Sequence, residues 1–245
     1  MSKLHVEDTV EVAPDLAAET ARALFIAAGA PADVADEVAG HLVEAEQCGV
    51  ASHGIVRTLQ YTREMLDGTL NPEARPEILG QDDNRFTVQA HGGIGIPAMR
   101  VAHELAAEQA VDKGLAAVAV LGAGHTGRLG AFGEGAAKKG CLTIALGGGN
   151  RKRWRMVAPY GGRDALLPTN PYCIAIPGGD RGRLCSTLPP LRRQVVGFMQ
   201  RVLRGLICPS GLLWTATAIR RAIRATTSME APSYPKAARW GMAWP

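Results

Sequence analysis

One histidine, His125, lies in a glycine-rich segment where its ring could move a proton. The segment, Gly122–Gly127, sits between an apolar run that ends at Leu121 and a helical pattern that begins at Leu129. Imidazole gains and loses a proton near neutral pH, and neighbouring glycines let a substrate come close. Hydride transfer to or from a carbinol needs such a group for the hydroxyl proton. The alternative is a loop histidine that merely caps a backbone group.

A second group of polar residues consists of Ser52, His53, Arg57 and Tyr61. If one helix begins near His53, then His53, Arg57 and Tyr61 are four residues apart and share one face. An imidazole, a guanidinium and a phenol in a row would suit a small carboxylate with a neighbouring hydroxyl, because the arginine fork matches a carboxylate. The alternative is a polar helix face that makes surface ion pairs.

The segment Gly122-Ala-Gly-His-Thr-Gly127 also matches the G-x-G-x-x-G fingerprint of Rossmann dinucleotide-binding domains. There, backbone amides at a helix N-terminus hold pyrophosphate, and an acidic residue about twenty residues on holds the ribose. The next apolar run ends at Leu146 and continues as Gly147–Asn150, without an acidic residue. A Rossmann-type dehydrogenase using Gly122–Gly127 therefore stays open as an alternative. The histidines show no metal-ligand spacing, so we expect no metal site.

The periodicity of apolar residues predicts alternating helices and strands. We expect helices over about 31–48, 53–66, 97–113 and 129–139, and strands over about 85–90, 115–121, 141–146 and 172–176. This order indicates an α/β fold in which helices pack on a sheet. We divide the chain into an N-terminal helical region (1–75), an α/β domain (76–183) and an aberrant tail (184–245).

Composition favours a cytoplasmic protein. No run of eighteen apolar residues is present, and residues 1–13 lack the apolar core of a secretory signal. The five cysteines are scattered, which favours free thiols in a reducing compartment. We therefore expect no membrane partner.

Charge separates the tail from the rest of the chain. Residues 1–183 carry 18 basic and 22 acidic residues, whereas residues 184–245 carry nine basic residues and one acidic residue. Such a tail is one signature of nucleic-acid binding, so a non-catalytic protein with a basic tail is a further alternative. However, the apolar residues of the tail keep no period, which predicts a disordered or irregular segment and no nucleic-acid partner.

Three blocks in order resemble the type-2 malate/L-lactate dehydrogenase family, which includes ureidoglycolate, sulfolactate and Δ1-piperideine-2-carboxylate enzymes. The first, Ala45–Tyr61, contains Gly-Val-x-Ser-His-Gly-x-x-Arg-x-x-x-Tyr, and the second is His125–Gly127. The third consists of Pro159–Gly162 followed by Thr169–Pro171. The resemblance covers about residues 1–183, and it implies that residues 1–75 form the substrate side and that residues 76–183 form an incomplete nicotinamide-binding domain.

The resemblance implies a non-Rossmann mixed-sheet nicotinamide fold, a homodimer, and hydride transfer between NAD or NADP and a small 2-hydroxy or 2-oxo acid or related imine. By motif, His125 would be the catalytic proton donor and acceptor, with Ser52 and His53 beside it. Arg57 and Tyr61 would bind substrate, with Arg57 on its carboxylate. Gly127, Thr169, Asn170 and Pro171 would contact the cofactor. Pro168 departs from the glycine usual before Thr-Asn-Pro, and Gly147–Asn150 is a subfamily variant, so the substrate stays open.

The tail has a second interpretation, which is a change of reading frame. Later family motifs are missing from it, but codons shifted by one position would restore two of them in order. In that frame Cys185–Leu191 can encode V-L-D-F-A-T-S, and residues 214–245 can encode a segment ending G-A-L-L-P-E-G-G-P-M-G-Y-G-L-A. We therefore hypothesise a frameshift between about Pro177 and Leu184, and a truncated product of doubtful activity.

The frameshift hypothesis predicts the third bases of codons 177–245. Sequencing the coding DNA should reveal free bases that spell both missing motifs in one shifted frame. Third bases that do not permit those motifs would end the hypothesis.

Overall fold

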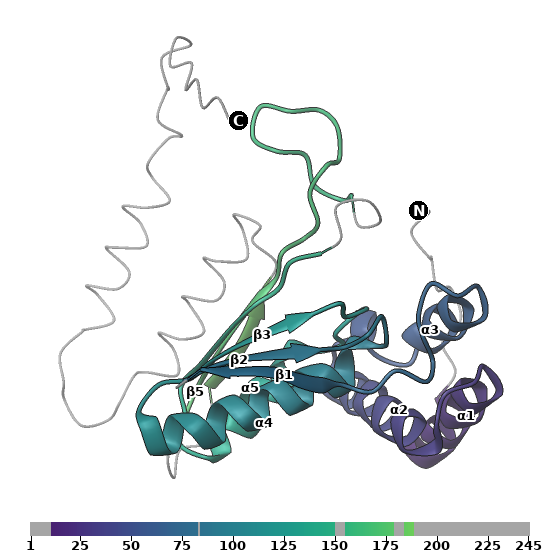
Figure 1. Ribbon diagram of the computed structural model, residues 1–245. Coiled ribbons are helices and arrows are strands. Elements are labelled where there is room, and N and C mark those ends of the chain that lie inside the picture. The colour runs from purple at the N-terminus through teal and green to yellow at the C-terminus, as the bar shows by residue number, and fades with distance from the viewer. Residues whose placement is uncertain (1–10, 83, 150–154, 179–183, 189–245) are drawn as a thin grey trace, which may run out of the picture. The chain divides into compact units, whose positions relative to one another are not determined.

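The computed structural model describes residues 11–82, 84–149, 155–178 and 184–188, all within one compact unit spanning Met1–Val195. Its helices and strands form a mixed α/β fold with two three-stranded sheets. Figure 1 shows helix α4 along one face of the β1–β2–β3 sheet, with α1, α2 and α3 grouped beyond one end of the strands. The core therefore has a helical part and a part formed by α4 on the first sheet.

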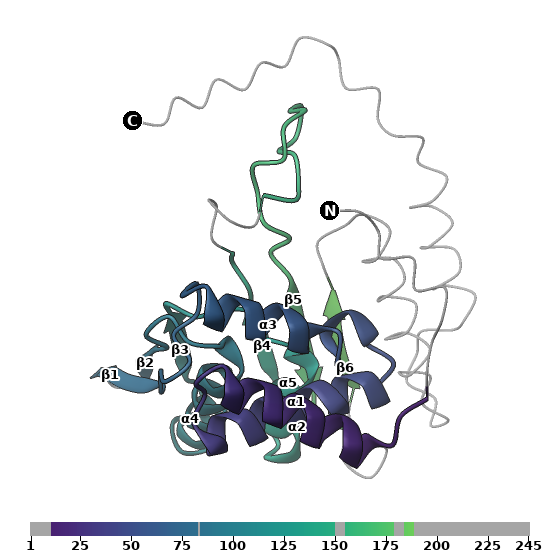
Figure 2. The same cartoon turned by 90° about the vertical axis from the view of Figure 1, so that its right-hand side faces the viewer.

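The helical part consists of α1 (Pro14–Ala27), α2 (Ala32–Gln47) and α3 (Arg57–Leu66). Figure 2 shows α1 running beside α2, and both helices contact α3. Sequence analysis predicted α2 but missed α1, although Pro14 in its first turn and Gly29 just beyond its end, with φ of 96°, are ordinary helix signals. Buried Phe25 of α1 packs on Tyr61 of α3, with ring centroids 6.3 Å apart. Helix α1 therefore helps to hold Tyr61, one of the predicted site residues, in place.

The predicted helix over 53–66 is wrong at its start. Residues Ala51–His53 form a separate 3-10 turn, and α3 begins at Arg57. Gly54 causes the break, because its ψ of −149° is not helical and the space of its missing Cβ is taken by the Glu46 carboxylate. That carboxylate accepts a hydrogen bond from the Ile55 N–H at 3.1 Å. His53 is therefore not on one helix face with Arg57 and Tyr61.

The first sheet has the order β1-β2-β3. Its strands are β1 (Glu77–Asp82), β2 (Arg85–Gln89) and β3 (Ala117–Leu121), with β2 antiparallel to β1 and parallel to β3. Helix α4 (Gly95–Lys113) places buried Ala98 and Ala102 against Val88 of β2. Strands β2 and β3 and helix α4 were predicted; β1 was not.

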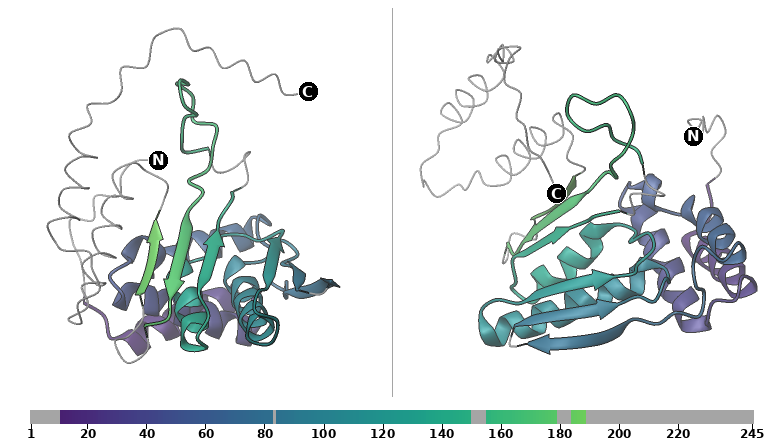
Figure 3. Two further views of the ribbon diagram at one scale, coloured as in Figure 1. Left: turned by 90° about the vertical axis from the view of Figure 1, so that its left-hand side faces the viewer. Right: turned by 45° about the horizontal axis from the view of Figure 1, so that its top comes forward.

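The second sheet has the order β4-β5-β6 and is antiparallel throughout. Its strands are β4 (Thr143–Leu146), β5 (Tyr172–Ile176) and β6 (Leu184–Leu188), with β5 in the middle (Figure 3). Helix α5 (Leu129–Lys138) packs on this sheet, where Ala145 and Cys173 are buried. Strand β6 corrects the expectation of an irregular segment from residue 184 onward, whereas residues 189–245 of the expected tail lie outside the described residues.

The core prediction concerns Leu42, which is fully buried in α2. Replacement by alanine leaves a cavity, so the free energy of unfolding should fall by about 2–5 kcal/mol in urea titration. The control is Leu59→Ala on α3, where the side chain is 61% exposed. Equal losses for the two variants would contradict the placement of Leu42.

Candidate functional site

The candidate site is centred on a contact between Tyr61 and His125, which are 64 residues apart in the chain. The Tyr61 hydroxyl oxygen lies 2.6 Å from Nδ1 of His125. Tyr61 is fully buried on α3, whereas His125 belongs to the loop between β3 and α5. The two predicted polar groups therefore meet in space.

Backbone contacts hold the His125 loop against the start of α4. Gly124 N–H donates to the Gly93 carbonyl at 2.8 Å, and Gly95 N–H donates to the His125 carbonyl at 3.0 Å. Because the two backbones touch, a Cβ at Gly95 would lie 2.7 Å from the Gly124 carbonyl oxygen. The side chain of His125 thus projects from a loop with little freedom.

The same packing bears on the G-x-G-x-x-G segment. The space beside Gly122 is filled by the Gln89 side chain, and that beside Gly124 by Leu70. These two glycines are therefore needed for close packing against other residues of the protein. In a Rossmann fingerprint, by contrast, the glycines let the backbone approach the pyrophosphate of a dinucleotide. After β3 and α5, moreover, the chain enters β4 in the other sheet rather than a parallel strand beside β3.

His53 and Ser52 join the cluster through the 3-10 turn. The rings of His53 and His125 have centroids 5.3 Å apart, and Ser52 Oγ lies 2.9 Å from Nδ1 of His53. Sequence analysis brought these residues together for the wrong reason, because the proposed single helix does not exist. The 3-10 turn nevertheless places His53 beside His125.

Arg57, at the start of α3, completes the cluster. Its Nε donates to the Ser52 carbonyl at 2.6 Å, and Nη1 donates to Oε1 of Gln60. Within the described part of the chain, its Nη2 has no hydrogen-bond partner. The guanidinium is therefore held in place with one donor group available for an anion.

Burial and nearby positive charge keep the site histidines neutral. Burial, with the charge of Arg57 and the neighbouring His53 and His41, lowers the pKa of His125 to about 3. Burial and Arg57 also lower the pKa of His53 below its ordinary value. Burial raises the pKa of Tyr61, so its hydroxyl keeps its proton at neutral pH.

The contacts of Nδ1 indicate the tautomer of neutral His125. Gly127 N–H donates to this nitrogen at 3.2 Å. A backbone N–H can only donate, so Nδ1 is the acceptor, the Tyr61 hydroxyl also donates to it, and Nε2 carries the ring proton. The arrangement can hold an anion at Arg57 and exchange a proton at Nε2.

The residues expected to bind cofactor fall in two places. Gly127 belongs to the His125 loop, with φ of 64°. Thr169–Pro171 lie before β5, where the Pro171 carbonyl accepts a hydrogen bond from Gly147 N–H at 2.7 Å and Asn170 has φ of 41°. The hydrogen bonds described for Thr169–Pro171 lead to Gly147 rather than to the His125 loop.

Sequence analysis missed His41 of α2, which is 8% exposed and contacts the His125 loop. Its signal is a polar residue three positions after Val38, on the apolar face of the helix. Burial, followed by the charge of Arg128, lowers the pKa of His41 to about 4, so it is neutral.

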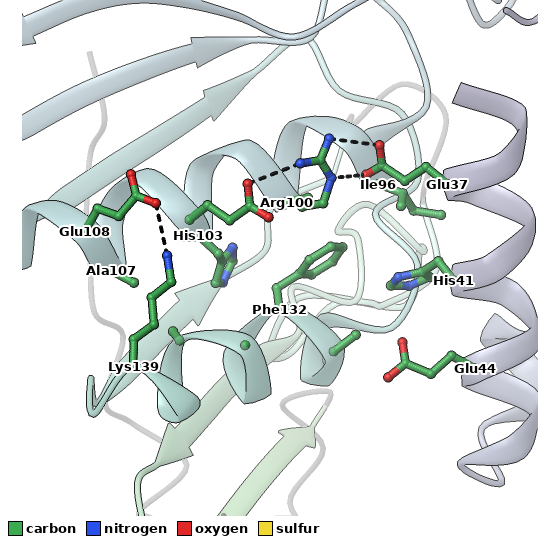
Figure 4. A pocket seen from close by; sticks show the side chains of 14 residues that line it. Glu37, His41, Glu44, Ile96, Arg100, His103, Ala107, Glu108, Phe132 and Lys139 are labelled. Carbon is green, nitrogen blue, oxygen red and sulfur yellow. Dashed lines mark hydrogen bonds and ion pairs between the residues drawn. The ribbon is translucent and has the colours of Figure 1, made fainter. Parts of the chain in front are cut away.

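A cavity of about 580 Å³ lies between α2, α4 and α5, beside His41 (Figure 4). His53, Arg57, Tyr61 and His125 do not line it. Among the described residues no group of His, Cys, Asp and Glu has the geometry of a metal site. None of the described helices is long and apolar enough to cross a membrane.

Comparison with known proteins finds relatives over the described region. The family described as malate/L-lactate dehydrogenase matches residues 12–185. An L-lactate dehydrogenase from Cupriavidus necator is 36% identical over 162 residues, which cover 66% of this chain and 46% of the relative. Hydroxycarboxylate dehydrogenase B from Escherichia coli K12 is 32% identical over 159 residues, covering 65% of this chain and 44% of the relative.

Solved structures agree in fold. Malate dehydrogenase from Entamoeba histolytica superposes with a TM-score of 0.68 at 25% identity, covering 80% of this chain and 54% of that one. A dehydrogenase from Sinorhizobium meliloti gives 0.65 at 30% identity, covering 74% and 55%. The chain spans about half the length of the relatives it matches. With residues 12–185 matched, the chain belongs to the malate/L-lactate dehydrogenase family.

Proposed function

We propose that this chain carries the substrate and proton-transfer site of an NAD(P)-dependent 2-hydroxy-acid dehydrogenase. The substrate would be a small 2-hydroxy or 2-oxo acid, or a related imine. The observation that carries the proposal is the convergence of Tyr61, His53 and Arg57 on His125. Family membership supports the same class of reaction.

Arg57 would bind the substrate carboxylate. Its Nε and Nη1 are fixed by Ser52 and Gln60, which leaves Nη2 as the donor for the anion. Charge-assisted hydrogen bonds of this kind are stronger than neutral ones. Ser52 and His53, in the adjoining turn, would lie along the bound acid.

His125 would supply or take the proton. Reduction of a 2-oxo acid consumes one hydride and one proton, and the proton would come from the imidazolium form of His125. Burial, followed by the charge of Arg57, disfavours that form in the ligand-free chain. A carboxylate bound to Arg57 would offset the repulsion by Arg57 and thereby raise the pKa of His125.

Oxidation of the 2-hydroxy acid requires a lone pair on Nε2 of His125. The ring proton must then sit on Nδ1. The Tyr61 hydroxyl permits this change because it can either donate to Nδ1 or accept from it. The Gly127 N–H can only donate, so it opposes a proton on Nδ1 and favours the other tautomer.

The hydride would come from NADH or NADPH, which supplies it when bound. Gly127, Thr169, Asn170 and Pro171 are proposed to contact this cofactor, although the described residues do not enclose it. A non-Rossmann binding mode is supported by the filled spaces beside Gly122 and Gly124 and by the separate antiparallel sheet. The N-terminal region (1–75) would serve the substrate side, and residues 76–183 the cofactor side, in a cytoplasmic homodimer.

Arg57→Gln tests the carboxylate site. Oxamate, an analogue of a 2-oxo acid, should bind the chain and raise the pKa of His125, as followed by imidazole NMR. The variant should weaken binding by about tenfold or more, because a hydrogen bond between charged groups is lost. Arg63→Gln, a change of an exposed arginine on the same helix, is the control. Oxamate affinity unchanged by Arg57→Gln would refute the assignment.

NADH binding tests the cofactor side. We expect the 245-residue chain on its own to bind NADH with a dissociation constant above about 1 mM, outside the usual enzyme range, since its proposed cofactor residues lie in two separate loops. Fluorescence titration measures this affinity. Clear NADH-dependent reduction of a 2-oxo acid that is lost in His125→Ala would contradict the expectation of weak binding while supporting the role of His125.

A further inference from the structure

Two histidines pack on Phe132 of α5, but they have different surroundings: His41 is buried and His103 is half-buried. The ring centroid of His41 lies 5.1 Å from that of Phe132, and the ring of His103 lies 5.4 Å from it. His103 contacts the Met99 carbonyl within its own helix, at 2.9 Å. His41, by contrast, reaches across from α2 to the loop that carries His125.

His41 accepts a hydrogen bond from the backbone of that loop. Its Nε2 lies 2.8 Å from the N–H of Arg128, 87 residues away, and the contact is buried. Arg128 caps the start of α5, where backbone N–H groups have no acceptor within the helix. His41 therefore satisfies a donor that burial would otherwise leave unpaired, and neutral imidazole suits this role.

The backbone passes His41 so closely that position 127 requires glycine. A Cβ at Gly127 would be blocked by Nε2 of His41 and would lie 3.0 Å from Ile96. The φ of 64° at Gly127 also disfavours other residues. The missing side chain at Gly127 therefore makes room for the ring of His41.

The side chain of Arg128 forms ion pairs with glutamates of two helices, and these also hold the Gly127–Arg128 peptide. Its Nη2 lies 3.0 Å from Glu44 of α2, and its Nη1 lies 2.8 Å from Glu134 of α5. The Arg128 side chain is 9% exposed, so these ion pairs are largely shielded from water on the arginine side. The peptide between Gly127 and Arg128 is thus held by its backbone and by a side chain.

The preceding peptide, between Thr126 and Gly127, lies next to the proposed proton-transfer group. Its N–H, on Gly127, donates to Nδ1 of His125, the nitrogen that also contacts the Tyr61 hydroxyl. Because the two peptides share the Cα of Gly127, a shift of the Gly127–Arg128 peptide would also move the N–H that disfavours a proton on Nδ1 of His125. His41 acts on His125 through the backbone and does not touch its reacting nitrogen.

We propose that His41 is a positioning residue that holds the Gly127–Arg128 peptide and thereby fixes the tautomer of His125. The consequence for turnover rests on the function proposed above, whereas the effect on the His125 ring does not. One edge of His41 lines the cavity between α2, α4 and α5 (Figure 4), and its Nε2 faces the loop. Truncation to alanine would join the cavity to the loop, so the test requires substitutions that keep the volume.

The test compares His41→Phe with His41→Gln in the full chain. Phenylalanine keeps the ring but offers no acceptor, whereas glutamine places an amide oxygen near the position of Nε2. In His41→Phe, hydrogen exchange of the Arg128 amide should accelerate by about tenfold, as expected for one lost hydrogen bond. The ¹⁵N shifts of His125 should change from one neutral tautomer toward a mixture. His41→Gln should restore both values.

His103→Phe is the matched control, because it alters the other histidine on Phe132 and leaves the loop contact intact. An equal effect of His103→Phe, or no effect of His41→Phe on a folded chain, would overturn the proposal. Failure of His41→Gln to restore the tautomer would also overturn it. If His41→Phe does not fold, Gly127→Ala must produce the same change of tautomer with His41 in place.

These NMR measurements separate the two hypotheses. If the chain shows no turnover and no oxamate binding, the proposed function fails, but the exchange rate and tautomer still decide the role of His41. If turnover is measurable, loss of the His41 contact should change kcat, because the balance between the two His125 tautomers shifts, and should leave KM nearly unchanged, because Arg57 is untouched. A change confined to KM would count against the positioning role.

Discussion

The hydrogen bond between Tyr61 and His125 is the interaction on which the rest of the candidate site depends. It joins a helix of the N-terminal region to the loop that follows β3, and it is partly buried, with Tyr61 fully enclosed. Burial makes the bond strong and also makes an unpaired partner costly. Two contacts keep these groups in place. Phe25 packs on the ring of Tyr61, and the backbone of Gly93–Gly95 forms hydrogen bonds with the His125 loop.

The fold could be predicted where a local signal was strong. Helices α2, α4 and α5 and strands β2 and β5 follow from apolar periodicity and from glycines at helix ends. Strand β1 escaped prediction because it carries exposed Ile78 and Leu79 without alternation. Strand β6 lies where charge and composition suggested no order, and it forms by pairing with β5, a partner that local pattern does not reveal.

The candidate site shows the same division. Residue chemistry and the family motif identified His125, His53, Arg57 and Tyr61, and the structure brings these four together. The prediction of one helix that aligns them was wrong, because the helix is interrupted at Gly54, where the Glu46 carboxylate occupies the space of a side chain. His41 was missed because its role depends on a backbone contact 87 residues away, which no spacing along the chain encodes.

The two sides of the site differ in how far their side chains are enclosed. The His125 loop is joined to the start of α4 by backbone hydrogen bonds, and glycines on both sides of this contact have no room for side chains. The Ser52–Gly54 turn is held by backbone hydrogen bonds of His53 and Gly54 and by Arg57 on the Ser52 carbonyl, but the side chain of Ser52 is exposed. Changes of substrate choice can therefore arise at Ser52 without rebuilding the acid–base chemistry at His125.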